Sequence, residues 1–249
     1  MQWDTAVPIR ARIGLIIPSG NRLTEPQFTD HAPSGVQIHV TRLRITGAYH
    51  RPLPEQLPRI VEAAQMLADA KCDVIVFHCT GSAMADGREA EQRVVEAIQQ
   101  ATGRAATTTA SALLEAFEAL GARRLVLVSP YDQATNDHET AFLAQAGIEV
   151  LHDRAMNLSS SEGYDAAPPD YWRQVTRDAA DPRADAYFLS CTNIQSMAVV
   201  EELERELGRP VVTSNQATLW YCLQALGLPD VLAGLGQLAR LQRRAHASV

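Results

Sequence analysis

The feature that most constrains the fold of this chain is an internal repeat, in which the second part of the sequence follows the first at an offset of 112 residues. The segment RLVLVSPYDQ, from Arg124, repeats the pattern of RIGLIIPSGN, from Arg12. Farther on, GRPVVTSNQATLWYCLQALG, from Gly208, matches GRAATTTASALLEAFEALG, from Gly103, at a shorter offset that implies a deletion. Such a repeat predicts two similar half-domains that face each other across a pseudo-twofold axis.

Each half alternates short apolar strands with longer segments of helical pattern. The predicted strands are residues 12–18, 36–45, 73–78, 124–130, 148–153, 185–190 and 209–214. The predicted helices are residues 54–71, 87–103, 110–121, 137–147, 170–180, 193–208 and 216–227. This alternation is typical of the α/β class, with mainly parallel sheets and helices on both faces. We expect residues 1–110 to form the first half-domain, residues 111–212 the second, and residues 213–249 to pack back onto the first.

Two cysteine–threonine pairs stand at equivalent positions of the repeat. Cys79 and Thr80 follow the apolar run DVIVFH, and Cys191 and Thr192 follow DAYFLS, again at an offset of 112 residues. Ligands of parallel α/β sheets bind beyond the carboxyl ends of the strands, which is where both pairs fall. The pseudo-twofold arrangement should therefore bring the two pairs to opposite sides of one cleft, where they would form a single site.

Two facing thiols allow two kinds of chemistry on a carbon substrate. The thiolate is the reactive form of cysteine, and a helix N-terminus lowers the pKa of a thiol; both Cys79 and Cys191 stand where a strand ends and a helix is expected to begin. One thiolate could remove a proton from a carbon while the other thiol returns one on the opposite face, which is racemisation. Alternatively, one thiolate adds to an electron-poor double bond and the other thiol supplies the proton, so that the resulting single bond can rotate. Free cysteines also serve as buried packing residues, and Cys72 and Cys222, which lack the repeat symmetry, are interpreted in that way.

Three polar residues near strand ends are further candidates for the site. Asn21 follows a strand and a turn, where its side chain could cap the next helix or donate to a substrate carboxylate. Tyr131, its approximate counterpart in the second half, suits either the core or a ligand site. Asn157 is typical of a turn on composition alone, at the start of a loop over residues 157–169 that could be a lid or a linker. His78 precedes the first of the two cysteines on its strand, so these neighbouring side chains should point to opposite faces.

Composition argues against several classes of function. A net charge of -7 argues against nucleic acid as the main partner, but it leaves room for a small anionic substrate held by main-chain amides. The sequence contains no Gly-x-Gly-x-x-Gly or Walker loop, and no Cys-x-x-Cys or His-x-x-x-His spacing, so neither a nucleotide cofactor nor a metal is expected. No apolar run approaches the roughly 20 residues of a membrane span, and the first residues lack the apolar stretch of a signal peptide. We therefore expect a cytoplasmic protein, with no membrane partner, whose cysteines are free thiols.

At these residues the sequence resembles the aspartate/glutamate racemase superfamily and, within it, the maleate cis-trans isomerases, with the arylmalonate decarboxylases as near relatives. The resemblance extends from IGLIIPSGN to VVTSNQATLWYCLQALG, and SCTNIQS and TSNQATLW are its most specific parts. It implies two flavodoxin-like half-domains with the site between them, no metal or organic cofactor, and a homo-oligomer such as a dimer or tetramer. The implied substrate is a small dicarboxylate.

The resemblance also implies a role for each candidate residue. Cys79 corresponds to the cysteine that attacks the alkene carbon in maleate isomerases and forms a succinyl-cysteine adduct, and Cys191 corresponds to the proton donor and acceptor. The predicted substrate-binding residues are Asn21, Tyr131 and Asn157, which correspond to residues that hold the carboxylates, together with Thr80 and Thr192. Two departures concern specificity: Gly20 replaces the second serine of the usual Pro-Ser-Ser-Asn loop, and the segment 44–54, with His50, could shape a larger pocket.

The leading hypothesis is a cofactor-independent isomerase that converts maleate to fumarate, or a related cis-enedioate to its trans isomer. A racemase or epimerase of an acidic carbon centre, such as that of an amino acid or a hydantoin, also uses two cysteines and is the main alternative. An arylmalonate decarboxylase is a weaker alternative, because that group carries glycine where this chain has Cys79. A binding or regulatory protein that has lost the chemistry is the remaining hypothesis, and the presence of both thiols argues against it.

Overall fold

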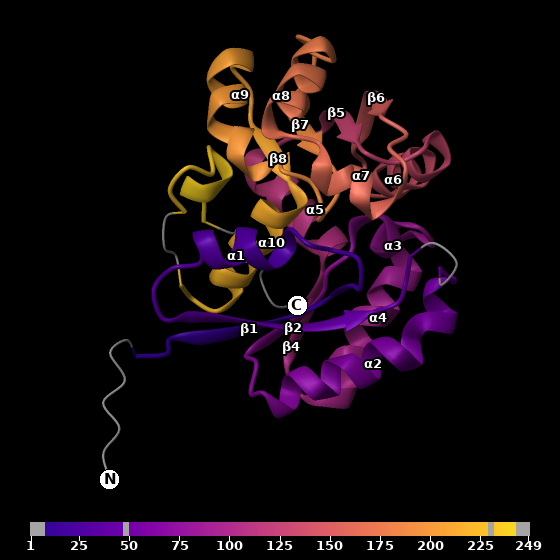
Figure 1. The fold of residues 1–249 in the computed structure, drawn as a ribbon, viewed down its shortest axis with the longest axis vertical. Coiled ribbons are helices and arrows are strands. Elements are labelled where there is room, and N and C mark those ends of the chain that lie inside the picture. Colours follow the sequence, from indigo (N-terminus) through magenta and orange to yellow (C-terminus); the bar gives the residue numbers. More distant parts are fainter. Residues whose placement is uncertain (1–7, 47–49, 229–231, 243–249) are drawn as a thin grey trace.

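The computed structural model describes residues 8–46, 50–228 and 232–242, which form two parallel sheets with helices around them (Figure 1). The strands of the first sheet are β1 (Ala11–Pro18), β2 (Val36–Leu43), β3 (Val74–Phe77) and β4 (Ala105–Thr108). Those of the second are β5 (Arg124–Ser129), β6 (Glu149–Ala155), β7 (Ala186–Leu189) and β8 (Val211–Thr213). The strand orders are β2-β1-β3-β4 and β6-β5-β7-β8, and every pairing is parallel. The predicted α/β class and its two similar halves are confirmed, because the two sheets have the same topology.

The repeat extends to the register of the strands. Ile16 pairs with Phe77 in the first sheet, and Val128 pairs with Leu189 in the second. Each member of the second pair lies 112 residues after its counterpart, so the two sheets align their central strands in the same way. As a result, β3 and β7 end at equivalent levels of their sheets, and each is followed after one residue by a cysteine.

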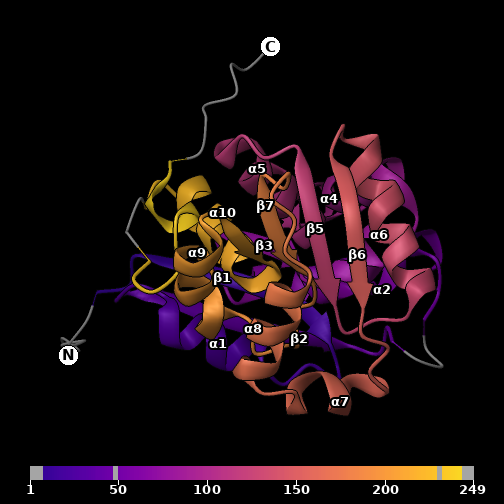
Figure 2. The same cartoon turned by 90° about the horizontal axis from the view of Figure 1, so that it is seen from above.

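Helices surround both sheets, and the view from above shows α6 running along β6 (Figure 2). The helices are α1 (Thr24–His31), α2 (Leu53–Asp69), α3 (Thr80–Met84), α4 (Gly87–Thr102), α5 (Thr109–Leu120), α6 (Gln133–Gln145), α7 (Ser160–Ala166), α8 (Pro169–Asp178), α9 (Val200–Leu207) and α10 (Ser214–Ala225), with 3₁₀ turns at Met197–Val199 and Leu238–Arg240. Helices α5 and α10, which are equivalent in the repeat, pack against each other where the two halves meet, and α10 also contacts α1 (Figure 1). The boundaries of the half-domains at residues 110 and 212 stay predictions.

The interior is filled by apolar side chains from both halves. Phe117 of α5 and Phe188 of β7 meet edge to face, with ring centroids 5.5 Å apart. Cys72 and Cys222 are fully buried among core side chains, which agrees with their interpretation as packing residues. None of the described helices has the length and hydropathy that crossing a lipid bilayer requires.

The chain after Cys191 differs from the prediction, which placed a helix at residues 193–208. Helix α9 begins only at Val200, after the 3₁₀ turn at Met197–Val199. The main-chain carbonyl of Thr192 instead accepts three side-chain hydrogen bonds, from Asn21, Thr24 and Asn215. This carbonyl is used by side chains distant in sequence, so it is not available to begin a helix.

Candidate active site

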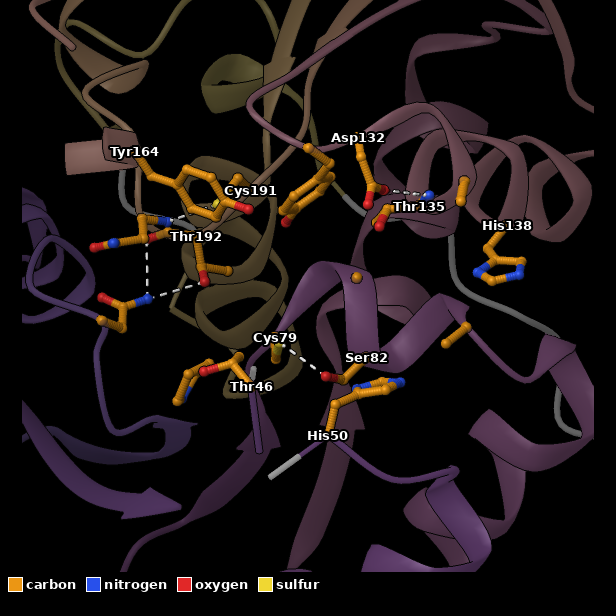
Figure 3. Close-up of a pocket in the computed structure, with 17 residues that line it drawn as sticks. Thr46, His50, Cys79, Ser82, Asp132, Thr135, His138, Tyr164, Cys191 and Thr192 are labelled. Carbon is orange, nitrogen blue, oxygen red and sulfur yellow. Dashed lines mark hydrogen bonds between the residues drawn. The ribbon is translucent and has the colours of Figure 1, made fainter. Parts of the chain in front are cut away.

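A cavity of about 550 Å³ lies between the two halves, at the carboxyl ends of the central strands (Figure 3). The predicted site residues that line it are Asn21, Cys79, Tyr131, Cys191 and Thr192. Cys79 comes from the end of β3 in the first sheet, and Cys191 comes from the end of β7 in the second. The fold therefore brings the two cysteine positions of the repeat to one cavity, as the sequence predicts.

Cys79 occupies the position immediately before α3, in an extended backbone conformation. Its thiol donates a hydrogen bond of 3.2 Å to the Oγ of Ser82, within the first turn of that helix. Burial raises the pKa of the Cys79 thiol, whereas the side-chain and main-chain groups of Ser82 act in the opposite direction. Ser82 is therefore placed to stabilise the thiolate. Sequence reasoning missed it, because a serine three residues after a cysteine carries no signal of its own.

Cys191 has a different environment, which an unusual backbone conformation produces. Its φ of 123° lies in the left-handed region that favours glycine. The Cys191 amide donates to the Oγ of Ser214 at 3.2 Å, and the Cys191 sulfur accepts from the amide of Asn193 at 3.3 Å. Burial raises the pKa of Cys191 to about 12, although the Tyr131 hydroxyl and the Asn193 amide oppose this shift. The Cys191 thiol thus keeps its proton at neutral pH.

The expectation that a helix begins directly after each cysteine is correct only for Cys79, and wrong for Cys191. Helix α3 begins at Thr80, but Cys191 is followed by turns up to the 3₁₀ turn at Met197–Val199. Burial also outweighs the local hydrogen-bond donors at both sulfurs, so both pKa values lie above the ordinary value. Sequence reasoning did not anticipate this shift, because burial depends on how the two halves pack.

Asn21 connects the two halves at the edge of the cavity. Its Nδ2 donates to the Oγ1 of Thr192 at 3.0 Å and to the Thr192 main-chain carbonyl at 3.2 Å, 171 residues away in sequence. Its Oδ1 accepts from the amides of Leu23 and Thr24, at 3.1 and 2.9 Å, beside the start of α1. Asn21 therefore supports the turn before α1 and lines the cavity at the same time.

Tyr131 and Tyr164 form a pair on the side of the cavity that belongs to the second half. Their rings meet edge to face, with centroids 5.8 Å apart. The Tyr131 hydroxyl hydrogen-bonds the sulfur of Cys191, and burial holds the Tyr131 pKa well above its ordinary value. Burial likewise raises the pKa of Tyr164 to about 12. Sequence reasoning did not single out Tyr164, because nothing local distinguishes this residue of α7 from an exposed tyrosine in a loop.

Comparison with known proteins identifies the family to which this site belongs. The family model of arylmalonate decarboxylase matches residues 13–239. The chain belongs to the arylmalonate decarboxylase family. It is 30% identical over 251 residues to the maleate isomerase of Nocardia farcinica, with 95% of this chain and 98% of that protein covered. It is 28% identical over 170 residues to the arylmalonate decarboxylase of Bordetella bronchiseptica, with 68% of this chain and 71% of that protein covered.

Solved structures of isomerases have the same fold as this family member. The maleate isomerase of Pseudomonas putida superposes with a TM-score of 0.87 at 26% identity, and 92% of this chain and 98% of that chain are covered. A cysteine-to-serine variant of the Nocardia farcinica maleate cis-trans isomerase, with a covalently bound succinylcysteine intermediate, superposes with a TM-score of 0.84 at 26% identity, covering 92% and 98% of the two chains. These findings confirm the resemblance seen in the sequence.

Two of the predicted residues, Thr80 and Asn157, do not line the cavity of this family member. Thr80 is fully buried, and its Oγ1 donates at 2.8 Å to the Oγ of Ser214, the same oxygen that accepts from the amide of Cys191. Ser214 thus links the two cysteine–threonine pairs. Asn157 is exposed, its φ of 48° is typical of a turn asparagine, and its amide donates to the Tyr131 carbonyl at 2.8 Å. The substrate-binding roles of Thr80 and Asn157 stay predictions.

His78, which neighbours Cys79 on the chain, is fully buried and is used for a structural link. One ring nitrogen hydrogen-bonds the Oδ1 of Asn215 and the other the Oγ1 of Thr109, each at 2.8 Å. Burial lowers the pKa of His78 to about 4, although the hydrogen bond to Asn215 opposes this shift. The neutral ring therefore joins the end of β3 to α5 and α10, and both of its nitrogens are engaged by groups other than the thiol.

The outer wall of the cavity carries His50 and His138, which are both exposed, together with Thr46 (Figure 3). Residues 47–49, in the predicted specificity segment, lie outside the described residues. No lysine or arginine is among the described residues that line the cavity. Amides, hydroxyls and imidazoles are therefore the groups available there to hold a carboxylate. In the described ranges of the chain, no three His, Cys, Asp or Glu side chains are grouped so that they could hold a metal ion.

Proposed function

We propose that this protein is a cofactor-independent isomerase that converts maleate, or a related cis-enedioate, to the trans isomer through two cysteines. The observation that carries the proposal is the placement of Cys79 and Cys191, from repeat-equivalent strand ends, on one cavity. The relatives named as maleate isomerases support the reaction class. The succinylcysteine intermediate in the Nocardia farcinica structure supports a covalent route.

Cys79 is the nucleophile in the proposed mechanism. Its thiolate attacks one alkene carbon, so that a carbon–sulfur bond forms and the electron pair of the double bond moves toward the neighbouring carbon and its carboxylate. Ser82 supports this assignment, because its hydroxyl and its main-chain amide both favour the thiolate of Cys79.

Cys191 is the general acid and base. Its thiol, whose pKa burial raises to about 12, keeps its proton at neutral pH and gives it to the carbon that carries the displaced electron pair. The adduct then contains a carbon–carbon single bond, about which it rotates. The Cys191 thiolate takes the proton back, the double bond re-forms, and the carbon–sulfur bond breaks. The trans isomer leaves, and Cys79 is again a thiolate.

Asn21, Thr192 and Tyr131 hold the substrate carboxylates in this proposal, since each places a hydrogen-bond donor on the cavity. Asn21 and Thr192 are only 2% and 3% exposed, so a carboxylate bound between them would meet little competing water. Asn157 and Thr80 would act indirectly, the first through the carbonyl of Tyr131 and the second through Ser214. The mechanism uses neither a metal nor an organic cofactor.

Proton NMR of the purified protein with maleate tests the proposal, because maleate and fumarate give separate alkene signals. We expect fumarate to accumulate with the wild-type protein and not with Cys79→Ala. If maleate stays unchanged and a chiral acid instead gains solvent deuterium at its alpha carbon, the protein is a racemase and the proposal is wrong. Release of carbon dioxide from an arylmalonate without any isomerisation would contradict it in the same way.

Tyr131→Phe should lower kcat about ten- to a hundredfold with a smaller change in KM, which corresponds to the roughly 1.5–3 kcal/mol of a hydrogen bond to a charged group. The variant loses the hydroxyl that hydrogen-bonds the Cys191 sulfur, while its ring can still pack against Tyr164. Steady-state kinetics would measure both constants. Tyr164→Phe is the matched control, because it preserves the ring pair and keeps the Tyr131 hydroxyl. A larger loss in the control than in Tyr131→Phe would contradict the assignment.

We also propose that the protein is a cytoplasmic homo-oligomer with a small-molecule substrate. All four cysteines are free thiols, which supports a reducing compartment. The oligomer is proposed from the family resemblance, and light scattering during size-exclusion chromatography would distinguish a dimer from a tetramer.

A further inference from the structure

Glu139 is a buried carboxyl that the proposed mechanism does not use. It lies on the inward face of α6 and is completely shielded from solvent. The hydroxyl of Ser190 faces its carboxyl. Within the part of the chain that the structure describes, however, neither the two carboxyl oxygens nor this hydroxyl makes a well-formed hydrogen bond. A carboxyl in such a place is costly to ionise, because nothing replaces the water that it has lost.

The position of Glu139 relates it to both thiols. Ser190, whose hydroxyl faces the carboxyl, is the residue immediately before Cys191, and α6 packs against α3, the helix that Cys79 precedes. A negative charge on Glu139 opposes thiolate formation at Cys79 and at Cys191, in addition to the larger effect of burial. It acts on the Tyr131 hydroxyl in the same sense. The carboxyl therefore lies within electrostatic reach of the proposed reacting groups.

The elements packed against α6 bring no cation that compensates a charge on Glu139. Helix α3 has no charged side chain, β6 brings Asp153, which is hydrogen-bonded to side chains of α6, and α4 brings Arg88, which is not among the causes of the Glu139 shift. On α6 itself, the other titratable residues, which are exposed, are Asp137 and His138, and Asp132 precedes the helix. Burial raises the pKa of Glu139 to about 8, and the Ser190 hydroxyl opposes the shift. Glu139 is therefore neutral at lower pH and ionised at higher pH.

We propose that Glu139 is a positioning residue that must hold its proton for Cys79 to become a thiolate, so that its ionisation sets the alkaline limit of catalysis. The kinetic part of this inference rests on the proposed function, whereas the effect on the thiol does not. With a neutral carboxyl, the buried site carries only the negative charge of the thiolate. An ionised carboxyl adds a second negative charge to the same volume, which lowers the thiolate population.

Alkylation of Cys79 by iodoacetamide tests the inference without any substrate. The rates for the wild type and Glu139→Gln are compared by mass spectrometry of the Cys79 peptide, because the thiolate is the species that reacts. Glutamine has the shape of a protonated carboxyl but cannot ionise. We expect similar rates at about pH 6, and about tenfold faster alkylation of the variant at about pH 9. The same rate ratio at both pH values would indicate a merely structural role and overturn the proposal.

Glu91→Gln is the matched control for this comparison. Glu91 is a second buried glutamate, but its carboxyl accepts hydrogen bonds from Thr108 and Ser111, and it is not among the groups that shift either thiol. Its variant should show the wild-type dependence of alkylation on pH. If the control gained the same tenfold increase as Glu139→Gln, the effect would not belong to Glu139, and the proposal would fail.

The pH profile of kcat/KM provides the kinetic arm. We expect the wild type to lose activity above about pH 8, where Glu139 ionises, and Glu139→Gln to show no such loss. If the wild type does not turn over maleate, the proposed function fails, and the alkylation ratio still decides the role of Glu139. If Glu139→Gln does not fold, Ser190→Ala replaces it. Loss of that hydroxyl favours the neutral carboxyl, so the suppression of alkylation should move to higher pH, and an unmoved suppression would overturn the inference.

Discussion

Replacing Cys79 by serine should lower kcat for maleate isomerisation by about 10⁴-fold or more, because a serine hydroxyl does not ionise where a thiol does. Serine has nearly the same shape and can still donate to Ser82, which accepts from the thiol at 3.2 Å. The loss would therefore report on the nucleophile rather than on the fold. Initial rates by proton NMR at saturating maleate would measure it, with circular dichroism as the check on folding.

Cys72→Ala is the matched control for this experiment. Cys72 is a fully buried free cysteine whose sulfur packs against Gly14 in the core, and it does not line the cavity. We expect this variant to lose about 1 kcal/mol of stability or more, while kcat per folded molecule stays within a few-fold of the wild type. Equal losses of kcat in Cys72→Ala and Cys79→Ser would show that neither loss reports on a nucleophile.

The partner cysteine should give a loss of a different kind. In Cys191→Ser the attack by Cys79 is still available, but the group that exchanges the proton is changed, so a covalent adduct should accumulate. The succinylcysteine intermediate in a cysteine-to-serine variant of the Nocardia farcinica isomerase supports this expectation. Intact-protein mass spectrometry should find an increase of one substrate mass, which the double variant Cys79→Ser/Cys191→Ser would not show. An adduct that forms in Cys79→Ser instead would reverse the two roles.

The second large effect should come from Asn21→Ala, with a loss of about 10³-fold in kcat/KM, because about 4 kcal/mol corresponds to one charge-assisted hydrogen bond to substrate and one or two within the protein. The variant removes the donor that reaches Thr192 across the two halves and the oxygen that accepts from the amide of Thr24. Its free energy of unfolding should also fall by about 2–3 kcal/mol. Urea unfolding would give the stability, and kinetics well below the melting temperature would give kcat/KM.

Asn136→Ala separates the two contributions to the Asn21 effect. Asn136 is fully buried and hydrogen-bonded to Ser129 and Asp153, but it does not line the cavity. It should therefore lose stability to a similar degree and keep kcat/KM within a few-fold. If Asn21→Ala behaved in the same way, Asn21 would only connect the two halves, and its predicted contact with the substrate would be wrong.

Much of the fold could be predicted because the sequence states it twice. The apolar strands and their offset of 112 residues led to two parallel sheets of the same order, and the structure pairs Ile16 with Phe77 and Val128 with Leu189 accordingly. The short helices α1, α3 and α7 were not predicted, because at 8, 5 and 7 residues they are too short to show a helical period. The helix expected from residue 193 also fails, since tertiary hydrogen bonds to the Thr192 carbonyl compete with it.

The candidate site was predictable only in part. The two cysteines, Asn21, Tyr131 and Thr192 were singled out and line one cavity, because strand ends of a repeat must meet at the same edge. Ser82 and Tyr164 were missed, although the first contacts Cys79 and the second packs on Tyr131. Neither has a sequence pattern of its own, and both matter through neighbours that only folding supplies.

The sequence by itself determined the class of the fold, the pairing of its halves and the position of both thiols, because strand periodicity and repeat spacing are properties of the covalent chain. The tertiary structure alone decided the chemistry around those thiols. It set the φ of 123° at Cys191, the hydrogen bonds of Asn21 to a residue 171 positions away, and the complete burial of Glu139. Burial and contacts between distant residues determine the free energy of each charged form, and these exist only once the two halves have packed together.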